Sequence, residues 1–435
     1  MLQENRVCDL RNPAFKPDNL LYGVVVIITF LFAVIQYAAI ITVFYTAILV
    51  YVLFRNRLIM HLNSFMYLIT LMMGMILFQI VFLNNTMLFN SGFAVKELSR
   101  LVIYLLIFLV IMNINVDFDC MYKLWVALLY LSLIIQVIQF TKVIMIDDWL
   151  RLIYGESQGI DMTVAYSTME YFRSGALFLN CNQYIKFALL VYCIILQKIE
   201  IDYLQGQRLG VIRHLTPVAA VFASIVFSGS RTGFIIFALI SIAFAAYFLS
   251  MSFPRLSMKG FIAVVITSAV MVIICLGIII AFSGRIAGLM KDFRIFHILL
   301  GLDTSMAYKS NTFLNLIEDA GIGNLLLGFG VFDTSGWEST LIDFDLGYMI
   351  SFFGVFGLFF YCLLIVSILS KNRCEGSVFH IIHYGAIAVI IFSSLSSGVF
   401  LNLRVFSVMI CALFVKKQIR SCIKRNGIDR YERNT

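Results

Sequence analysis

Long apolar runs recur along the chain and are separated by polar connections, most of them short. Each run is about 20 residues long, which is the length that a helix needs to cross a hydrocarbon core of about 30 Å. Because a backbone in lipid must satisfy its own hydrogen bonds, each run predicts a helix, and the ten-residue alternation typical of membrane barrels does not occur. The predicted spans are 20–36, 38–54, 65–83, 100–117, 124–140, 182–199, 214–230, 232–250, 260–282, 346–370, 378–396 and 399–415.

The composition strengthens this prediction. Hydrophobic residues make up 61% of the 435 residues and charged residues only 13%, whereas a soluble domain carries about 25% charged residues. We therefore expect an all-α, polytopic membrane bundle of about twelve helices, which forms a single membrane domain over residues 1–435. The nine cysteines lie mostly within apolar runs and form no C-x-x-C pair, so neither a cofactor nor a metal site is expected.

The net charge of +8 has two readings. A basic chain can bind nucleic acid, but 20 of the 32 basic residues fall in the N-terminal segment, in alternate connections and in the tail 416–435. That distribution follows the positive-inside rule, so we expect two cytoplasmic termini and no nucleic-acid partner. The long connections 141–181 and 283–345 then lie outside. Because connections of this length are often functional, they indicate that the protein acts on the outer face of the membrane. Their aromatic residues could stack on sugars or belong to an interfacial belt.

Several basic residues approach the outer face. Arg231 lies between two apolar runs in the segment 227–233, with almost no loop. A guanidinium group binds phosphate oxygens in a bidentate manner, and the alternative is an arginine that snorkels at a helix end. A binding site for a polyanionic lipid headgroup would use further candidates from separate segments. These are Arg173, Lys186 and Arg404, with Asn180, Asn182 and Ser230 as polar neighbours.

The second long connection carries several acids and one histidine. Most of these acids are expected to be solvated loop charges, but Asp343 and Asp345 immediately precede an apolar run. A carboxylate at that place could deprotonate an acceptor hydroxyl beside a membrane-embedded leaving group. His297 is a rival base, because its ordinary titration range suits proton transfer near neutral pH.

Five segments resemble signatures of the bacterial O-antigen polymerase and ligase superfamily. The run 227–233, Phe-Ser-Gly-Ser-Arg-Thr-Gly, is similar to the S-x-S-R-x-G signature of that family. The other similar segments are 173–175 with 180–182, 327–330, 343–348 and 353–357. Their order, spacing and predicted side of the membrane agree with the family pattern.

The resemblance implies a Wzy-type polysaccharide polymerase with a GT-C-like fold in the bacterial inner membrane. Such glycosyltransferases move a growing glycan from undecaprenyl diphosphate to the non-reducing sugar of a new lipid-linked repeat unit, without a nucleotide sugar or a metal. Arg173 and Arg231, then Arg404, would bind the diphosphate, and Asp345 or Asp343 would act on the acceptor. Implied partners are undecaprenyl-diphosphate-linked oligosaccharides, the lipid bilayer, a chain-length regulator and a flippase. The glycan could be the O-antigen of lipopolysaccharide, a capsule or an exopolysaccharide.

Two departures from the family pattern keep alternatives open. Cys181 stands where the family usually has proline, and a spacing of ten residues between Arg and Gly, described in some polymerases, is absent. One alternative is an O-antigen ligase, although that branch usually has a histidine in place of the acids at 343–345. Another is a flippase or transporter for lipid-linked oligosaccharides, although those proteins have short connections on both faces.

Overall fold

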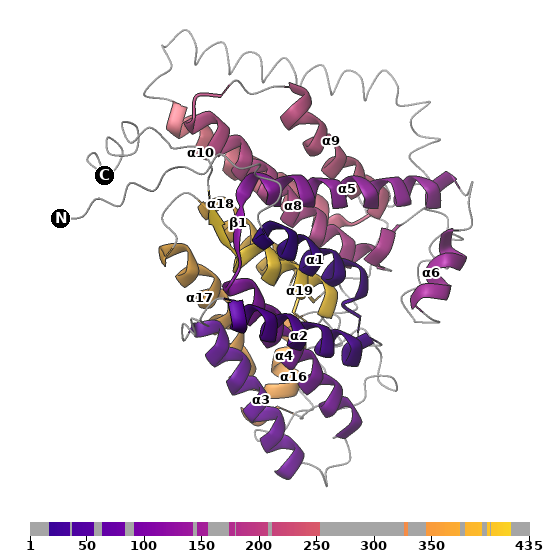
Figure 1. Ribbon diagram of the computed structural model, residues 1–435, viewed down its shortest axis with the longest axis vertical. Coiled ribbons are helices and arrows are strands. Elements are labelled where there is room, and N and C mark those ends of the chain that lie inside the picture. The colour runs from indigo at the N-terminus through magenta and orange to yellow at the C-terminus, as the bar shows by residue number, and fades with distance from the viewer. Residues whose placement is uncertain are drawn as a thin grey trace, which may run out of the picture.

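The computed structural model is an almost entirely helical bundle (Figure 1). The residues that the structure describes are 17–34, 37–55, 63–82, 91–141, 146–154, 174–178, 180–207, 211–252, 326–328, 345–374, 379–393, 398–400 and 402–418. The predicted span 260–282 lies outside these residues, as does most of the predicted loop 283–345.

Within the described residues, each predicted apolar run contains helix. The helices are α1 (Pro17–Phe32), α2 (Ala38–Arg55), α3 (Ser64–Phe82), α4 (Ser91–Met112), α5 (Phe118–Thr141), α6 (Ile146–Tyr154), α8 (Cys181–Leu204), α9 (Val211–Ser228), α10 (Arg231–Ser252), α16 (Asp345–Phe353), α17 (Val355–Cys374), α18 (His380–Ser393) and α19 (Leu403–Leu413). A short 3-10 helix, η3, covers Ala176–Phe178.

Four of the described helices are long and apolar enough to cross a membrane. They are α2, α3, α5 and the stretch Thr232–Ser250 of α10. Five further apolar helices are shorter, at 10 to 17 residues. The all-helical membrane architecture is therefore supported, while the number of twelve spans stays a prediction.

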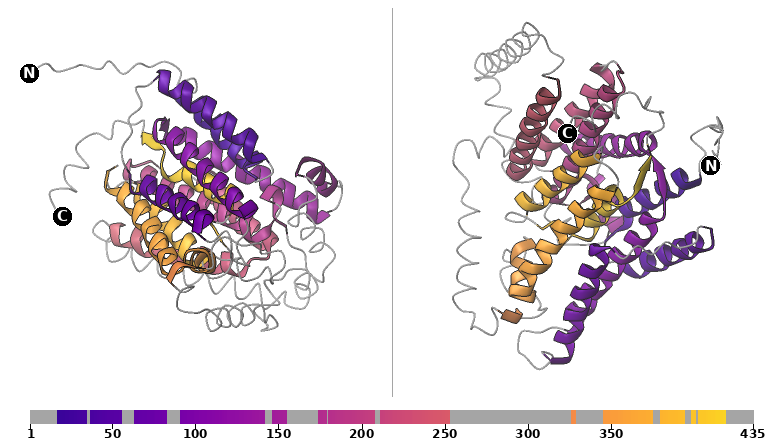
Figure 2. Two further views of the ribbon diagram at one scale, coloured as in Figure 1. Left: turned by 90° about the horizontal axis from the view of Figure 1, so that it is seen from below. Right: turned by 90° about the vertical axis from the view of Figure 1, so that its left-hand side faces the viewer.

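Helix α8 forms the centre of the bundle (Figure 1). Nearly all of its side chains are buried, and it packs against α5, α9, α10, α18 and α19. At Gly385 of α18, an added Cβ would lie 2.2 Å from Cys193 Sγ, so this glycine lets α18 approach α8 closely. By contrast, α2 and α3 lie at the edge of the bundle (Figure 2) and expose large apolar side chains such as Phe54 and Val81, as expected of helices that face lipid.

The predicted span 346–370 is wrong as a single helix. The chain breaks between α16 and α17 at Gly354, whose φ of 59° lies in the left-handed region that favours glycine. The two helices then pack against each other so closely that a Cβ on Gly357 would lie 1.8 Å from the Met349 carbonyl oxygen.

Changing Gly357 to alanine is therefore expected to destabilise the fold by about 1–3 kcal/mol, because an overpacked contact against backbone must open. Thermal unfolding of the purified protein in detergent would measure the loss. The matched control is Gly74→Ala in α3, where an added Cβ meets nothing within 4 Å and helix propensity favours alanine. Equal melting temperatures for the two variants would contradict the packing argument.

The all-α prediction also missed a pair of short parallel strands. Strand β1 (Asn115–Asp117) pairs with β2 (Lys416–Gln418), so Val116 lies opposite Lys417. The predicted span 100–117 thus ends as a helix at Met112, and the predicted tail 416–435 begins as a strand. The sequence hides this pairing because each strand is only three residues long and its partner is remote.

Ion pairs join residues at one end of the bundle. Arg55 pairs with Asp18 at 2.8 Å, and Lys198 pairs with both Asp119 at 2.5 Å and Asp202 at 2.8 Å. All these residues fall in segments predicted to share one side of the membrane. The contacts bring these helix ends together, and the side of the membrane on which they lie stays a prediction.

Candidate functional site

Three short segments between the long helices lie around the ends of α8, α9 and α19 that are remote from these ion pairs, and each lies beside candidate residues. They are residues 174–178, the turn 228–230 and residues 398–400. The Ser174 N–H donates a hydrogen bond to the Phe227 carbonyl at 3.0 Å, and Gln136 of α5 donates to the Ser174 carbonyl at 3.3 Å. The first segment is therefore held against the ends of α5 and α9.

The turn between α9 and α10 places Arg231 at the start of a helix. Gly229 has a φ of 58°, and the Ser230 hydroxyl accepts a hydrogen bond from the Gly233 N–H at 3.2 Å, as a helix N-cap does. Gly233 also lies against α8, since an added Cβ would be 2.3 Å from Ile185 Cγ1. The first turn of α10, with its partial positive charge, thus lies beside the candidate segments.

Some predicted site residues cannot be placed in this geometry. Arg173 and Asp343 lie outside the described residues, as does His297, and the side chain of Arg231 is not among the described ones. Their predicted roles stay predictions.

Three buried side chains hold the segment 398–400. Lys186 Nζ donates to the Gly398 carbonyl, Asp345 Oδ2 accepts from the Val399 N–H at 2.6 Å, and Tyr104 Oη donates to the Phe400 carbonyl at 2.7 Å. These side chains come from α8, α16 and α4. An unpaired backbone group inside a membrane protein costs several kcal/mol, so this arrangement allows a non-helical segment there. Lys186 and Asp345 therefore have a structural partner in addition to any role toward a ligand.

Arg404, in the first turn of α19, donates to backbone carbonyls as Lys186 does. Its guanidinium group donates to the carbonyls of Leu177 and, at 3.0 Å, Leu31, and it lies 5.5 Å from the centre of the Phe178 ring. The side chain is buried. Arg404 thus ties the segment 174–178 to α1 and α19.

The two predicted asparagines differ in surroundings. The Asn180 side chain caps α8 by accepting from the Asn182 N–H at 2.8 Å. An added Cβ on Gly175 would lie 2.6 Å from the Asn180 backbone, so the turn before α8 needs a glycine there. Asn182 is half-buried at the first turn of α8.

The sequence analysis missed a second polar cluster next to this site. Arg100 donates to Tyr348 Oη at 2.8 Å and pairs with Glu97, while Tyr348 Oη donates to Glu97 Oε2 at 2.7 Å. The Arg100 guanidinium also lies 5.6 Å from the centre of the Phe400 ring. An arginine three residues after a glutamate, at the start of an apolar run, was the only signal for this cluster.

The arrangement defines a class of site. Cations from α8 and α19, the N-terminal turn of α10 and a buried carboxylate lie beside the segments 174–178 and 398–400 at one end of an apolar helical bundle. Positive charge next to a helix N-terminus can bind an anion. Among the described residues, no three His, Cys, Asp or Glu side chains gather as a metal site. The sequence matches no protein-family model and no curated protein.

Proposed function

We propose that the chain is a membrane glycosyltransferase that polymerises undecaprenyl-diphosphate-linked oligosaccharide repeat units on the outer face of the bacterial inner membrane. One observation carries the proposal: segments 174–178, 227–233, 345–348 and 398–400, remote in sequence, are linked at one end of the bundle. The links are direct or pass through Ile185 and Lys186 of α8 and Arg404 of α19. Three of these segments carry the motifs that resemble the polymerase and ligase superfamily.

The donor diphosphate is assigned to the cationic part of this cluster. Arg173 and Arg231 bind its oxygens, with Arg404 and Lys186 adding positive charge behind the backbone carbonyls that they contact. The first turn of α10, capped by Ser230, and the polar side chains of Asn180 and Asn182 provide further donors. Donors that are already in place stabilise the charge that builds on the leaving diphosphate.

The transfer is a single displacement at the anomeric carbon. The acceptor hydroxyl oxygen forms the new bond to that carbon, the bond to the diphosphate oxygen breaks, and undecaprenyl diphosphate leaves. The hydroxyl proton passes to a carboxylate, for which Asp343 and Asp345 are the candidates. Asp345 is 0% exposed and accepts from the Val399 N–H, so it also positions the segment 398–400, while Asp343 precedes it by two residues.

The proposal requires the topology that the basic residues predict, with both termini in the cytoplasm and the two long connections outside. Substrates are then lipid-linked oligosaccharides in the outer leaflet, and a flippase and a chain-length regulator are the expected partners. Neither a metal nor a nucleotide sugar takes part.

Purified full-length protein in proteoliposomes, given undecaprenyl-diphosphate-linked repeat units, tests the proposal. The expected product is a ladder of glycans that differ by one repeat unit. Transfer of glycan only to a lipid A core acceptor would identify a ligase, and movement of the lipid-linked unit across the bilayer without a new glycosidic bond would identify a flippase. Either result would overturn the polymerase assignment.

A further inference from the structure

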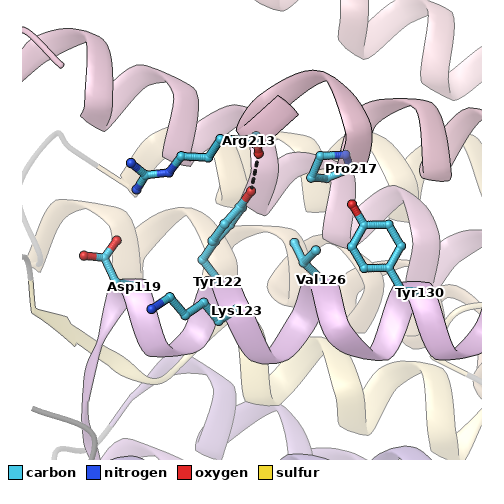
Figure 3. Close-up of a pocket in the computed structure, with 7 residues that line it drawn as sticks. All are labelled: Asp119, Tyr122, Lys123, Val126, Tyr130, Arg213 and Pro217. Carbon is cyan, nitrogen blue, oxygen red and sulfur yellow. Dashed lines mark hydrogen bonds between the residues drawn. The ribbon is translucent and has the colours of Figure 1, made fainter. Parts of the chain in front are cut away.

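A hollow lies between α5 and α9, away from the candidate site. Its volume is about 460 Å³, and its lining residues are Asp119, Tyr122, Lys123, Val126, Tyr130, Arg213 and Pro217 (Figure 3). Gln136 and Gln139 of α5 contact the segment at Ser174, whereas Lys123 lies 13 residues earlier on that helix. At 1.5 Å per residue the two regions are about 20 Å apart along α5.

The hollow is preformed by contacts between the two helices. Tyr122 Oη donates to the Arg213 carbonyl at 3.2 Å across the gap between α5 and α9 (Figure 3). Pro217 of α9 and Val126 of α5 line the hollow next to this bridge (Figure 3). A ligand therefore meets walls whose spacing is already fixed, which lowers the ordering cost of binding.

The lining is charged at one end and mostly apolar at the other. Asp119, Lys123 and the Arg213 guanidinium group lie toward one end, and Val126, Pro217 and Tyr130 lie toward the other (Figure 3). From Lys123 to Tyr130 the hollow follows two turns of α5, or about 10 Å. Because α5 is one of the helices long and apolar enough to cross a membrane, the apolar end extends toward the hydrocarbon region.

The charged end has a net positive charge. The Asp119 carboxylate is engaged by Lys198 at 2.5 Å, and Arg213, which is 51% exposed, reaches Asp202 only at 3.5 Å. Lys123 is exposed and forms no ion pair with any residue that the structure describes. Arg213 also lies in the first turn of α9, where the helix dipole favours an anion.

We propose that this hollow binds an anionic glycerophospholipid. Its phosphate lies between Lys123 and Arg213, and the part of one acyl chain nearest the headgroup lies along Val126, Pro217 and Tyr130. A free phosphate ion would use only the charged end, and a lipid without net charge would bring no net negative charge to the exposed Lys123. The combination of a basic end and an apolar end favours a lipid that carries negative charge in its headgroup.

Native mass spectrometry of the full-length protein, released from detergent, tests this site. The probes are phosphatidylglycerol and phosphatidylcholine with identical acyl chains, and the expected result is a clear excess of bound phosphatidylglycerol. Lys123→Gln is expected to lower phosphatidylglycerol binding about fivefold, since one basic residue near the surface contributes about 1 kcal/mol to binding an anionic lipid. Phosphatidylcholine binding should not change.

The matched control is Lys96→Gln, which removes an exposed lysine of α4 that does not line the hollow. This variant should bind phosphatidylglycerol as the unmodified protein does. Equal losses in both lysine variants would overturn the proposal, and so would equal binding of the two lipids. Displacement of phosphatidylglycerol by millimolar inorganic phosphate would also overturn it, because the site would then recognise the ion alone.

Discussion

Replacing Arg231 with alanine is expected to lower the rate of glycan chain extension by a factor of about 10² to 10³, the loss seen when one donor to a developing anion is removed. The residue begins α10, directly after Ser230, at the place where the candidate segments meet. Arg231→Lys should retain part of the activity, because it keeps the charge and loses the bidentate geometry. The measurement is the rate of ladder formation in proteoliposomes at equal protein content.

The control for this loss is Arg55→Ala at the opposite end of the bundle. Arg55 pairs with Asp18 at 2.8 Å and is partly exposed, so its removal should leave chain extension unchanged. A normal ladder from Arg231→Ala would remove this residue from the mechanism.

Changing Asp202 to asparagine is expected to lower the free energy of unfolding by about 3–5 kcal/mol, because breaking a buried ion pair is strongly destabilising. Lys198 then keeps only the partly exposed Asp119 as a counter-charge. The Lys198 and Asp202 side chains are 3% and 1% exposed, with 2.8 Å between Nζ and Oδ1. Arg213 and His214 also approach the same carboxylate, at 3.5 Å and 3.4 Å. Unfolding in detergent micelles, followed by circular dichroism, would measure the loss.

Asp119→Asn provides the comparison, since it removes the other carboxylate that contacts Lys198. The Asp119 side chain is 41% exposed, and solvent screens such pairs to about 1 kcal/mol or less. The Asp202 variant should therefore unfold at a much lower denaturant concentration than the Asp119 variant. Similar stability of the two would mean that burial does not set the strength of this network.

The helices could be predicted from the sequence because an apolar run of membrane length satisfies its own backbone hydrogen bonds in lipid by forming a helix. The break at Gly354 could not, since a glycine between Phe353 and Val355 also fits a continuous helix. Its left-handed φ accompanies the close packing of Gly357 on Met349, a tertiary contact. The pairing of Val116 with Lys417 was hidden for a related reason. Three-residue strands carry no periodicity, and only the folded bundle brings them together.

For the candidate site, the basic residues near the outer face could be identified from the sequence, but the groups that they contact could not. Lys186 and Arg404 were candidates for contact with a ligand, with snorkelling as the alternative for Lys186, and the structure gives each a backbone carbonyl from a segment between the long helices. Such partners depend on the path of residues 174–178 and 398–400, which tertiary packing sets. The Glu97, Arg100 and Tyr348 cluster was missed because Tyr348 joins it from a helix some 250 positions away.

The parallel pairing of β1 with β2 has a consequence for biosynthesis. Residues 115–117 leave the ribosome well before residues 416–418 exist, because about 300 residues, or tens of seconds at 5–20 residues per second, separate them. During that interval the β1 backbone has only water or transient partners for its ladder hydrogen bonds. The strand β1 between α4 and α5 can therefore pair with β2 only after α19 has been synthesised. An early and a late part of the nascent chain must then meet to form this two-stranded sheet.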